Sequence, residues 1–371
     1  MNELVGRADR IVGRAAARRY WPICVALTIA AASCNGVGRV PGDDHRLYAI
    51  KLFSPAASGG SAERYHPDIA LPLLARGLGA TSPRAFFLLC LAIVLAALAA
   101  LAWRLRAMLE PDAAVILFAL VLAHPVVTIL LSWIGEPDAI TFAMTAVALL
   151  SSSPVAISAA AAVGVANHTM AIASLALVLV VRWAAGERIA ARHAAALLVG
   201  LVLGSALVRQ FLAAQHLTAG SRLEFVADIG FAYWIKQSLG SLPILLWSLH
   251  GGVWFALIAC ACLLWDTKRA YVLTQAAAMS VALLAALVSL DTTRVFALLA
   301  WAPAIHLVLT AWRAESQGQE RDALRRALLV VAVAALMTPR LFVWEGTVVA
   351  SPFRNLPVRI YHGVPGTFDA R

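Results

Sequence analysis

Charged residues are scarce in this chain. They make up 13% of its 371 residues, whereas hydrophobic residues make up 61%. A soluble domain keeps itself dispersed with a far more polar surface, and about a quarter of its residues are typically charged. The mean hydropathy of +0.81 points the same way. The composition therefore excludes an ordinary soluble protein and predicts a polytopic membrane protein.

Acidic residues are fewer than basic ones, 20 against 30, which gives a formal net charge of +10. Such an excess can indicate nucleic-acid binding when the basic residues share one face. Here the arginines stand at the ends of apolar runs instead. Membrane lipids with anionic headgroups are therefore the predicted partners, and no nucleic acid is expected.

Cysteine is also rare, and no set of cysteines has the spacing of a zinc or redox site. We interpret the five as small packing residues. The first apolar run follows a basic N-terminus, as in a signal peptide, but Cys34-Asn35-Gly36 is a poor cleavage site. We therefore expect the run to be retained as a span.

The distribution of arginine sets the predicted topology. Five arginines precede the run from Tyr20 to Ser33, and the positive-inside rule then places the N-terminus in the cytoplasm. Following the apolar runs predicts an all-α transmembrane bundle of about eleven crossings in a bacterial cytoplasmic (inner) membrane. The predicted units are one transmembrane domain (1–339) with an outer loop (35–83) and an outer interfacial segment (215–243), followed by an extracytoplasmic tail (340–371).

The region from Ala139 to Arg182 is too long for one span. Two spans would place the arginines at 182, 188 and 192 outside, against the charge rule. We predict three short crossings, with Asn167-His168-Thr169 turning near the outer surface. Helices shorter than about 20 residues are tolerated in a membrane when other helices or a cavity surround them.

This topology brings polar residues from distant parts of the sequence to the outer rim. Ionisable groups at membrane depth are costly and usually mark function. Two structural alternatives stand beside this hypothesis: Asp138 can simply start a helix, and Asp291 with Arg294 can form a surface ion pair. The predicted rim residues are Asp43, Asp44, Arg64, His66, Glu136, Asp138, His168, Asp291 and Arg294.

The least ordinary of these features is the adjacent pair Asp43-Asp44, in a polar segment from Gly42 to Arg76. Two neighbouring carboxylates repel each other, and a loop beside a span gains nothing structural from them. The alternative is an ordinary solvated loop. Three histidines within apolar runs are instead expected to be hydrogen-bonded packing residues: His124, His250 and His306.

A cytoplasmic N-terminus, one span and a first outer loop with an acidic pair resemble the GT-C superfamily of integral-membrane glycosyltransferases. The chain also resembles a group of bacterial membrane proteins with a similar layout, in the order of the segments GDDHRLYAIKLF, RYHPDIALPLLARGLG, GEPDAITFAM and DTTRVFALLAWAP. This resemblance covers roughly residues 20–312. The resemblance to the GT-C superfamily implies a donor sugar linked to a polyprenyl phosphate and transferred at the outer face.

That implied chemistry assigns roles to the rim residues. Asp44 or Asp43 is the expected catalytic base, with Asp44 favoured. Basic residues are expected to stabilise the lipid phosphate, and a divalent metal held by the acidic residues is left open. The predicted substrate-binding residues are Arg46, Arg64, His66, Asp138, His168, Asp291 and Arg294.

Two other classes of function fit the same topology. A lipid or solute transporter or flippase often has broken helices with polar turns, such as Ser151-Ser152-Ser153-Pro154. Against it, the hydropathy shows no internal repeat and the polar groups gather at one face. The second is a non-catalytic membrane partner of an envelope-assembly complex.

Overall fold

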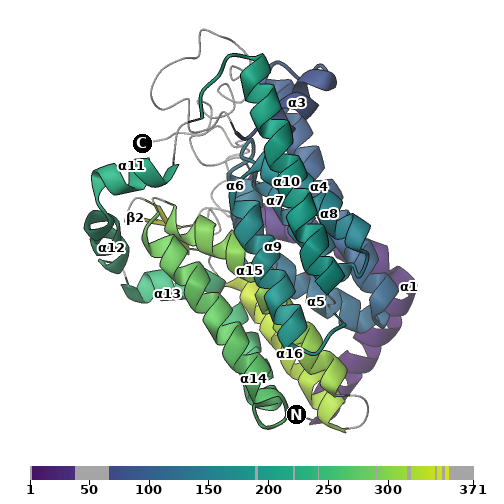
Figure 1. Cartoon of the computed structure of the whole chain (residues 1–371). Coiled ribbons are helices and arrows are strands. Elements are labelled where there is room, and N and C mark those ends of the chain that lie inside the picture. The colour runs from purple at the N-terminus through teal and green to yellow at the C-terminus, as the bar shows by residue number, and fades with distance from the viewer. Residues whose placement is uncertain are drawn as a thin grey trace.

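The computed structural model describes residues 2–37, 67–188, 191–219, 222–240, 242–289, 291–315, 319–338, 341–344 and 347–350. Helices dominate these residues, and a two-stranded hairpin follows the last helix (Figure 1). The elements are α1 (Asn2–Asn35), α3 (Ala70–Gly77), α4 (Pro83–Met108), α5 (Pro111–Ala123), α6 (Pro125–Ser132), α7 (Asp138–Leu150), α8 (Pro154–Asn167), α9 (Met170–Ala184), α10 (Ala191–Ala214), α11 (Arg222–Ile229), α12 (Phe231–Leu239), α13 (Leu242–His250), α14 (Val253–Leu287), α15 (Thr292–Ala314), α16 (Gln319–Met337), β1 (Leu341–Trp344) and β2 (Thr347–Ala350).

Several of these helices are long and apolar enough to span a membrane. Within the described ranges, α4, α10, α14 and α15 meet that condition, and α5 with α6 adds a fifth span bent by 60°. Pro125 explains the bend, because proline removes a backbone donor and clashes with the preceding turn. These helices are compatible with a multi-pass membrane protein.

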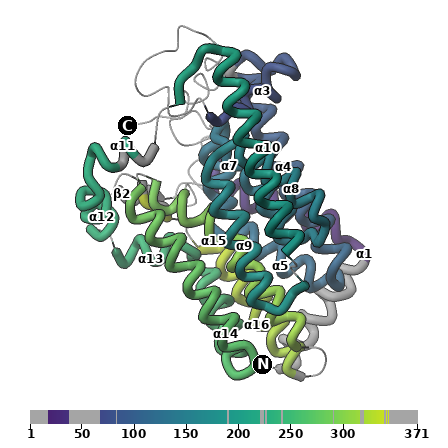
Figure 2. Tube along the Cα trace, viewed as in Figure 1, coloured from purple at the N-terminus to yellow at the C-terminus, as the bar shows by residue number. Residues whose placement is uncertain are grey.

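Helix α14 folds back on itself. Its backbone leaves the helical conformation at Lys268. The ring of His250, just before α14, lies 3.2 Å from the Sδ atom of Met279 in its second half. A straight helix would separate these positions by about 40 Å, at 1.5 Å per residue. Figure 2 shows the turn at the lower end of the view.

The region predicted to make three short crossings forms three short helices, α7, α8 and α9. Asn167 at the end of α8 donates to Pro137 O at the start of α7, at 2.6 Å. Arg182 near the end of α9 donates to Ser151 O just after α7, also at 2.6 Å. The three helices are therefore antiparallel neighbours, with the Asn167 turn at the end where α7 begins.

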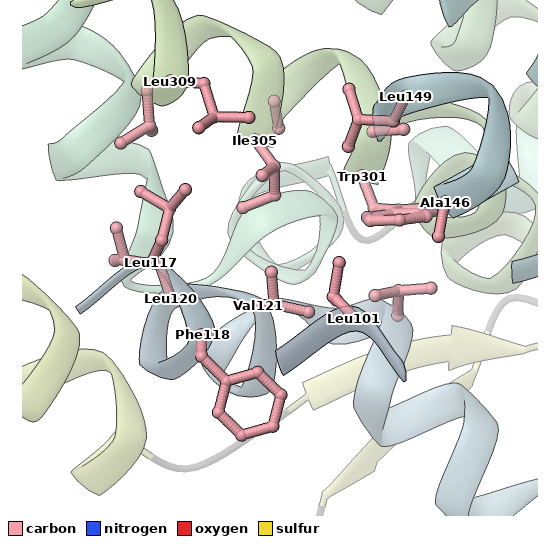
Figure 3. Close-up of a cluster of buried hydrophobic side chains, with 14 of the residues drawn as sticks. Leu101, Leu117, Phe118, Leu120, Val121, Ala146, Leu149, Trp301, Ile305 and Leu309 are labelled. Carbon is pink, nitrogen blue, oxygen red and sulfur yellow. The ribbon is translucent and has the colours of Figure 1, made fainter. Parts of the chain in front are cut away.

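The core of the bundle is organised around α15. In its most apolar stretch 94% of the residues are buried, against 22% for α10 at the periphery. Figure 3 shows side chains of α4, α5, α7 and α15 gathered into one buried cluster. The ring of Trp301 packs against that of Phe142 of α7, with centroids 4.3 Å apart. The labelled members are Leu101, Leu117, Phe118, Leu120, Val121, Ala146, Leu149, Trp301, Ile305 and Leu309.

Two glycines let α10 approach α8 closely, and the two helices lie side by side in Figure 1. A Cβ atom on Gly200 would collide with Ser158 O and come within 2.6 Å of the Cβ of Ala161. One on Gly204 would lie 2.6 Å from Ala162 O. This spacing of small residues is the one that packs helices together in membranes, where van der Waals contact drives association.

The α8–α10 contact gives a first prediction. Gly200→Ala should destabilise the protein by about 1–3 kcal/mol, because the obstructing atoms include backbone that must shift. Gly77→Ala is the matched control, since a Cβ there meets nothing within 4 Å. Thermal unfolding in detergent measures both variants. Equal melting temperatures for the two would contradict the close packing of α8 and α10.

The chain after α16 is not only a tail. The sequence predicts a tail from residue 340, but β1 and β2 pair in antiparallel fashion, with Leu341 opposite Ala350. Val343 is buried, and its N–H donates to Thr293 Oγ1 at 2.9 Å. The hairpin therefore packs on the start of α15. A cluster of charged residues lies at this same point of the fold.

Within the predicted interfacial segment 215–243, α12 has one buried face and one exposed face. Trp234 is buried, and Ser238 Oγ lies 3.2 Å from Thr292 Oγ1. Phe231 and Tyr233 are exposed. Such an amphipathic helix with exposed aromatic rings is typical of a segment at a membrane surface.

Candidate functional site

Four charged side chains from two distant parts of the sequence meet at the start of α7 and α15. Arg294 Nε donates to Asp138 Oδ2 at 2.8 Å, and its Nη2 donates to Asp138 Oδ1 at 3.1 Å. Nη2 also donates to Glu136 Oε2 at 2.9 Å, and Nη1 donates to Asp291 Oδ2 at 3.0 Å. We call these four residues the carboxylate cluster, and the end of the bundle that holds it the carboxylate end.

The local backbone explains why the carboxylates converge. Gly135 has a φ of 112°, a conformation that glycine adopts without strain, and Pro137 precedes the first residue of α7. The turn therefore presents Glu136 and Asp138 to the same neighbour. Asp291 and Arg294 are three residues apart at the start of α15, a spacing that suits an ion pair.

The carboxylate cluster is largely withdrawn from solvent. The side-chain exposure is 13% for Arg294, 2% for Asp138, 11% for Glu136 and 21% for Asp291. Both simple alternatives therefore describe only part of the arrangement. Asp138 starts α7 but its carboxylate bonds to Arg294, and the pair of Asp291 with Arg294 extends to two more carboxylates.

These contacts engage most of the hydrogen-bonding capacity of Arg294. Four of its five N–H groups donate to carboxylate oxygens, two of them as a fork to Asp138. With every group ionised, three carboxylates and one guanidinium carry a formal charge of −2. A phosphate would accept the usual fork of two hydrogen bonds from Arg294 only by displacing a carboxylate. The geometry therefore assigns Arg294 to positioning the carboxylates, and its predicted contact with a lipid phosphate stays a prediction.

The polar turn after α8 adjoins the carboxylate cluster. Asn167 Nδ2 donates to Pro137 O and, at 3.2 Å, to Thr141 Oγ1. Asn167 thus braces the turn that holds Glu136 and Asp138. His168 is buried, and its Nδ1 accepts the N–H of Met170 at 3.0 Å at the start of α9. The structure therefore places His168 at the carboxylate end, and its role toward a substrate stays a prediction.

The predicted residues of the first outer loop, namely Asp43, Asp44, Arg46, Arg64 and His66, lie outside the described residues. The described residues on either side of that loop are held at the carboxylate end. Asn35 Oδ1 accepts from Thr128 Oγ1 of α6 at 2.9 Å. Ile69 N–H donates to Ala166 O, beside Asn167, at 2.8 Å. Both connections of the loop therefore lead to the end of the bundle that holds the carboxylate cluster.

No group of three His, Cys, Asp or Glu side chains in the described ranges is arranged to hold a metal ion. The carboxylate oxygens of Glu136, Asp138 and Asp291 instead surround a guanidinium. The sequence leaves a divalent metal open, and the described residues add no site for one.

A second charged cluster, which the sequence does not predict, lies at the opposite end of the bundle. Glu187, just after α9, accepts from Arg182 Nε at 2.7 Å, from Arg313 Nη1 at 3.1 Å and from His306 Nε2 at 3.2 Å. Burial raises the pKa of Glu187, but hydrogen bonds from His306 and Arg182 together outweigh it and lower the pKa to about 2. An acidic residue among arginines is the only sequence signal for this cluster.

Two buried histidines are in contact, His124 between α5 and α6 and His250 at the end of α13, just before α14. The N–H of Val126 donates to His124 Nδ1 at 3.1 Å, so the hydrogen of His124 must be on Nε2, which lies 2.9 Å from His250 Nδ1. The hydrogen of His250 is then on Nε2, facing Met279 Sδ. Both rings are neutral in this chain of hydrogen bonds. The prediction that these histidines are hydrogen-bonded packing residues agrees with the contacts.

Comparison of the chain with protein-family models, with curated proteins and with solved structures gives no match. The functional argument therefore rests on the site itself.

Proposed function

We propose that the chain is a membrane glycosyltransferase that takes a sugar from a polyprenyl-phosphate donor at the outer face of a bacterial cytoplasmic membrane. The observation that carries the proposal is the carboxylate cluster, which is assembled from distant segments at one end of the bundle. The connections of the loop with Asp43 and Asp44 lead to the same end. The layout of the N-terminal part, one span followed by an outer loop with an acidic pair, resembles that of GT-C enzymes and supports the same class.

The basic residues of the loop and the carboxylate cluster carry opposite charges, so we assign them different roles in the transfer. In the transfer, the acceptor oxygen attacks the anomeric carbon, the bond from that carbon to the phosphate oxygen breaks, and a carboxylate takes the acceptor's proton. The phosphate gains charge and needs cations. Because the carboxylate cluster is negative, we assign the phosphate to Arg46, Arg64 and His66 of the loop, and sugar or acceptor hydroxyls to the cluster.

The proposed topology has about eleven crossings, with the N-terminus in the cytoplasm and the C-terminus outside. The direction of the helices supports it, because successive long segments run alternately from the carboxylate end to the opposite end and back. Arginines concentrate at the opposite end, as the positive-inside rule requires of a cytoplasmic face. Those within the described ranges include Arg104, Arg106, Arg182, Arg188, Arg192, Arg313, Arg321, Arg325 and Arg326.

The topology leads to a labelling prediction. In a variant with Cys34 and Cys262 replaced by Ala, a cysteine at Ser58 or Gly366 should react with an impermeant thiol reagent in intact cells. A cysteine at Ser316 should react only after the cells are opened. Labelling at Ser316 in intact cells with protection at Ser58 would invert the topology and place the acidic pair in the cytoplasm.

A transporter or flippase is the second candidate, and one observation favours it. The break between α5 and α6 and the break between α13 and α14 meet at the His124–His250 pair. Broken helices at the centre of a membrane protein frequently line transport sites.

One experiment tests the proposal against this alternative. The purified chain is reconstituted in vesicles with a radiolabelled polyprenyl-phosphate sugar and a crude envelope acceptor fraction. We expect label to move covalently from lipid to acceptor. Movement of intact labelled lipid between leaflets, without a covalent product, would contradict the glycosyltransferase and support the transporter.

A further inference from the structure

An apolar cavity of about 430 Å³ lies between α4 and α7. Its volume is in the range of sites that bind small molecules. Small side chains leave this space: Ala97 and Ala100 on α4 face Ala143 and Ala146 on α7. The cavity also borders Leu101, one of the buried side chains labelled in Figure 3. The walls are suited to a hydrocarbon chain.

One end of the cavity is polar and basic. Arg104 and Ser151 line it there, beside Trp103. The side chain of Arg104 is exposed, and its Nη2 donates to Leu150 O at 3.4 Å. Among the described residues Arg104 forms no ion pair, in contrast to Arg182 and Arg294. Trp103 is 59% exposed, as expected of an indole at the level of lipid headgroups.

We infer that this cavity binds one anionic phospholipid, with an acyl chain between α4 and α7 and the phosphate on Arg104. The charge of Arg104 complements the phosphate, and a guanidinium donates to phosphate oxygens in a fork. The alanine-lined walls accommodate the chain. Both parts of one lipid thus meet complementary parts of one cavity.

The lipid site is separate from the proposed sugar-transfer site. Arg104 contacts the last residue of α7, whereas Asp138 is the first. The 13 residues of α7 separate the two by about 20 Å at 1.5 Å per residue. A lipid with its phosphate on Arg104 therefore belongs to the leaflet opposite the carboxylate cluster. The inference holds whether or not the chain transfers sugar.

Native mass spectrometry of the full chain in detergent tests this inference, with phosphatidylglycerol and phosphatidylcholine as probes. Arg104→Gln should weaken phosphatidylglycerol binding about fivefold, the usual effect of one basic residue on an anionic lipid. Ala143→Phe, which fills the cavity, should weaken the binding of the same lipid. Phosphatidylcholine, whose ammonium offsets the charge of its phosphate, should bind more weakly to the native chain and lose less affinity than phosphatidylglycerol in Arg104→Gln.

Arg192→Gln is the matched control. Arg192 is exposed, and its neighbour His193 contacts Ser152 O, so it lies at the same end of the bundle as Ser151. Equal weakening by Arg192→Gln and Arg104→Gln would show general surface attraction and overturn the inference. Normal binding by a folded Arg104→Gln variant would also overturn it. Glycerol phosphate, which has no acyl chain, should not compete; competition by it would show a phosphate site without a lipid cavity.

Discussion

Arg294→Ala should destabilise the protein by about 3–5 kcal/mol and abolish sugar transfer. Removing one partner from a buried ionic group leaves the other charges unpaired, and this cost exceeds the value of the interaction itself. Here the variant leaves Glu136, Asp138 and Asp291 repelling one another in a site where Asp138 is 2% exposed. Thermal unfolding in detergent and the vesicle transfer assay measure the two effects.

Arg321→Ala is the matched control for this variant. Arg321 pairs with Glu110 at 3.1 Å, but the two side chains are 25% and 62% exposed. Such a partly exposed pair contributes about 0–1 kcal/mol, and the contact of the Arg321 guanidinium with the Trp312 ring adds about 0.5–1 kcal/mol. The melting temperature should therefore fall much less than in Arg294→Ala. Equal effects of Arg294→Ala and Arg321→Ala would reduce the carboxylate cluster to a surface ion pair.

Two further variants separate charge from geometry at Arg294. Arg294→Lys should keep part of the stability and activity, because lysine restores the charge but not the planar fork that holds Asp138. Adding Asp138→Asn to Arg294→Ala should recover part of the lost stability, since it removes one unpaired carboxylate. Full activity in Arg294→Ala would exclude the cluster from the reaction.

Asp44→Asn should lower the rate of sugar transfer about 100-fold or more, with normal membrane levels. Asparagine keeps the shape of the side chain and removes its basicity, and loss of a general base typically has this effect. Neighbouring side chains in an extended segment point to opposite sides, so only one of Asp43 and Asp44 can face a given hydroxyl. We expect Asp43→Asn to have the smaller effect.

The relative activities of Asp43→Asn and Asp44→Asn show which carboxylate is the base. A larger loss in Asp43→Asn would move the role of base to Asp43 and keep the mechanism. Full transfer by both variants would leave the proposed enzyme without its catalyst, and the transporter would then be the better account.

The sequence predicts local features of this fold well. Apolar runs and arginine positions predict the helices, and the length of the region from Ala139 to Arg182 predicts its division into three. The convergence of Asp138, Asp291 and Arg294 at one end also follows from the order of the apolar runs. The helices depend on composition over a short stretch of chain, which sequence patterns record directly, whereas the convergence depends on the order of the runs along the whole chain.

The individual hydrogen bonds between distant residues could not be predicted from these sequence patterns. Nothing near Glu187 in the sequence indicates that His306 and Arg313 contact it across more than 100 residues. The contact of Arg294 with three carboxylates likewise depends on the turn at Gly135, which directs two of them to one guanidinium. A prediction from the sequence identifies the charged residues at one end of the bundle but not their hydrogen bonds.

The central claim is that the loop with the acidic pair and the carboxylate cluster form one site. Cross-linking with a short bifunctional thiol reagent tests it, using cysteines at His45 and at Thr169, an exposed residue beside Asn167, in a chain without its own cysteines. Arg188→Cys, exposed at the opposite end, replaces Thr169→Cys in the control. The account predicts a cross-link between positions 45 and 169 and none between 45 and 188. A cross-link from 45 to 188, or none to 169, would contradict it.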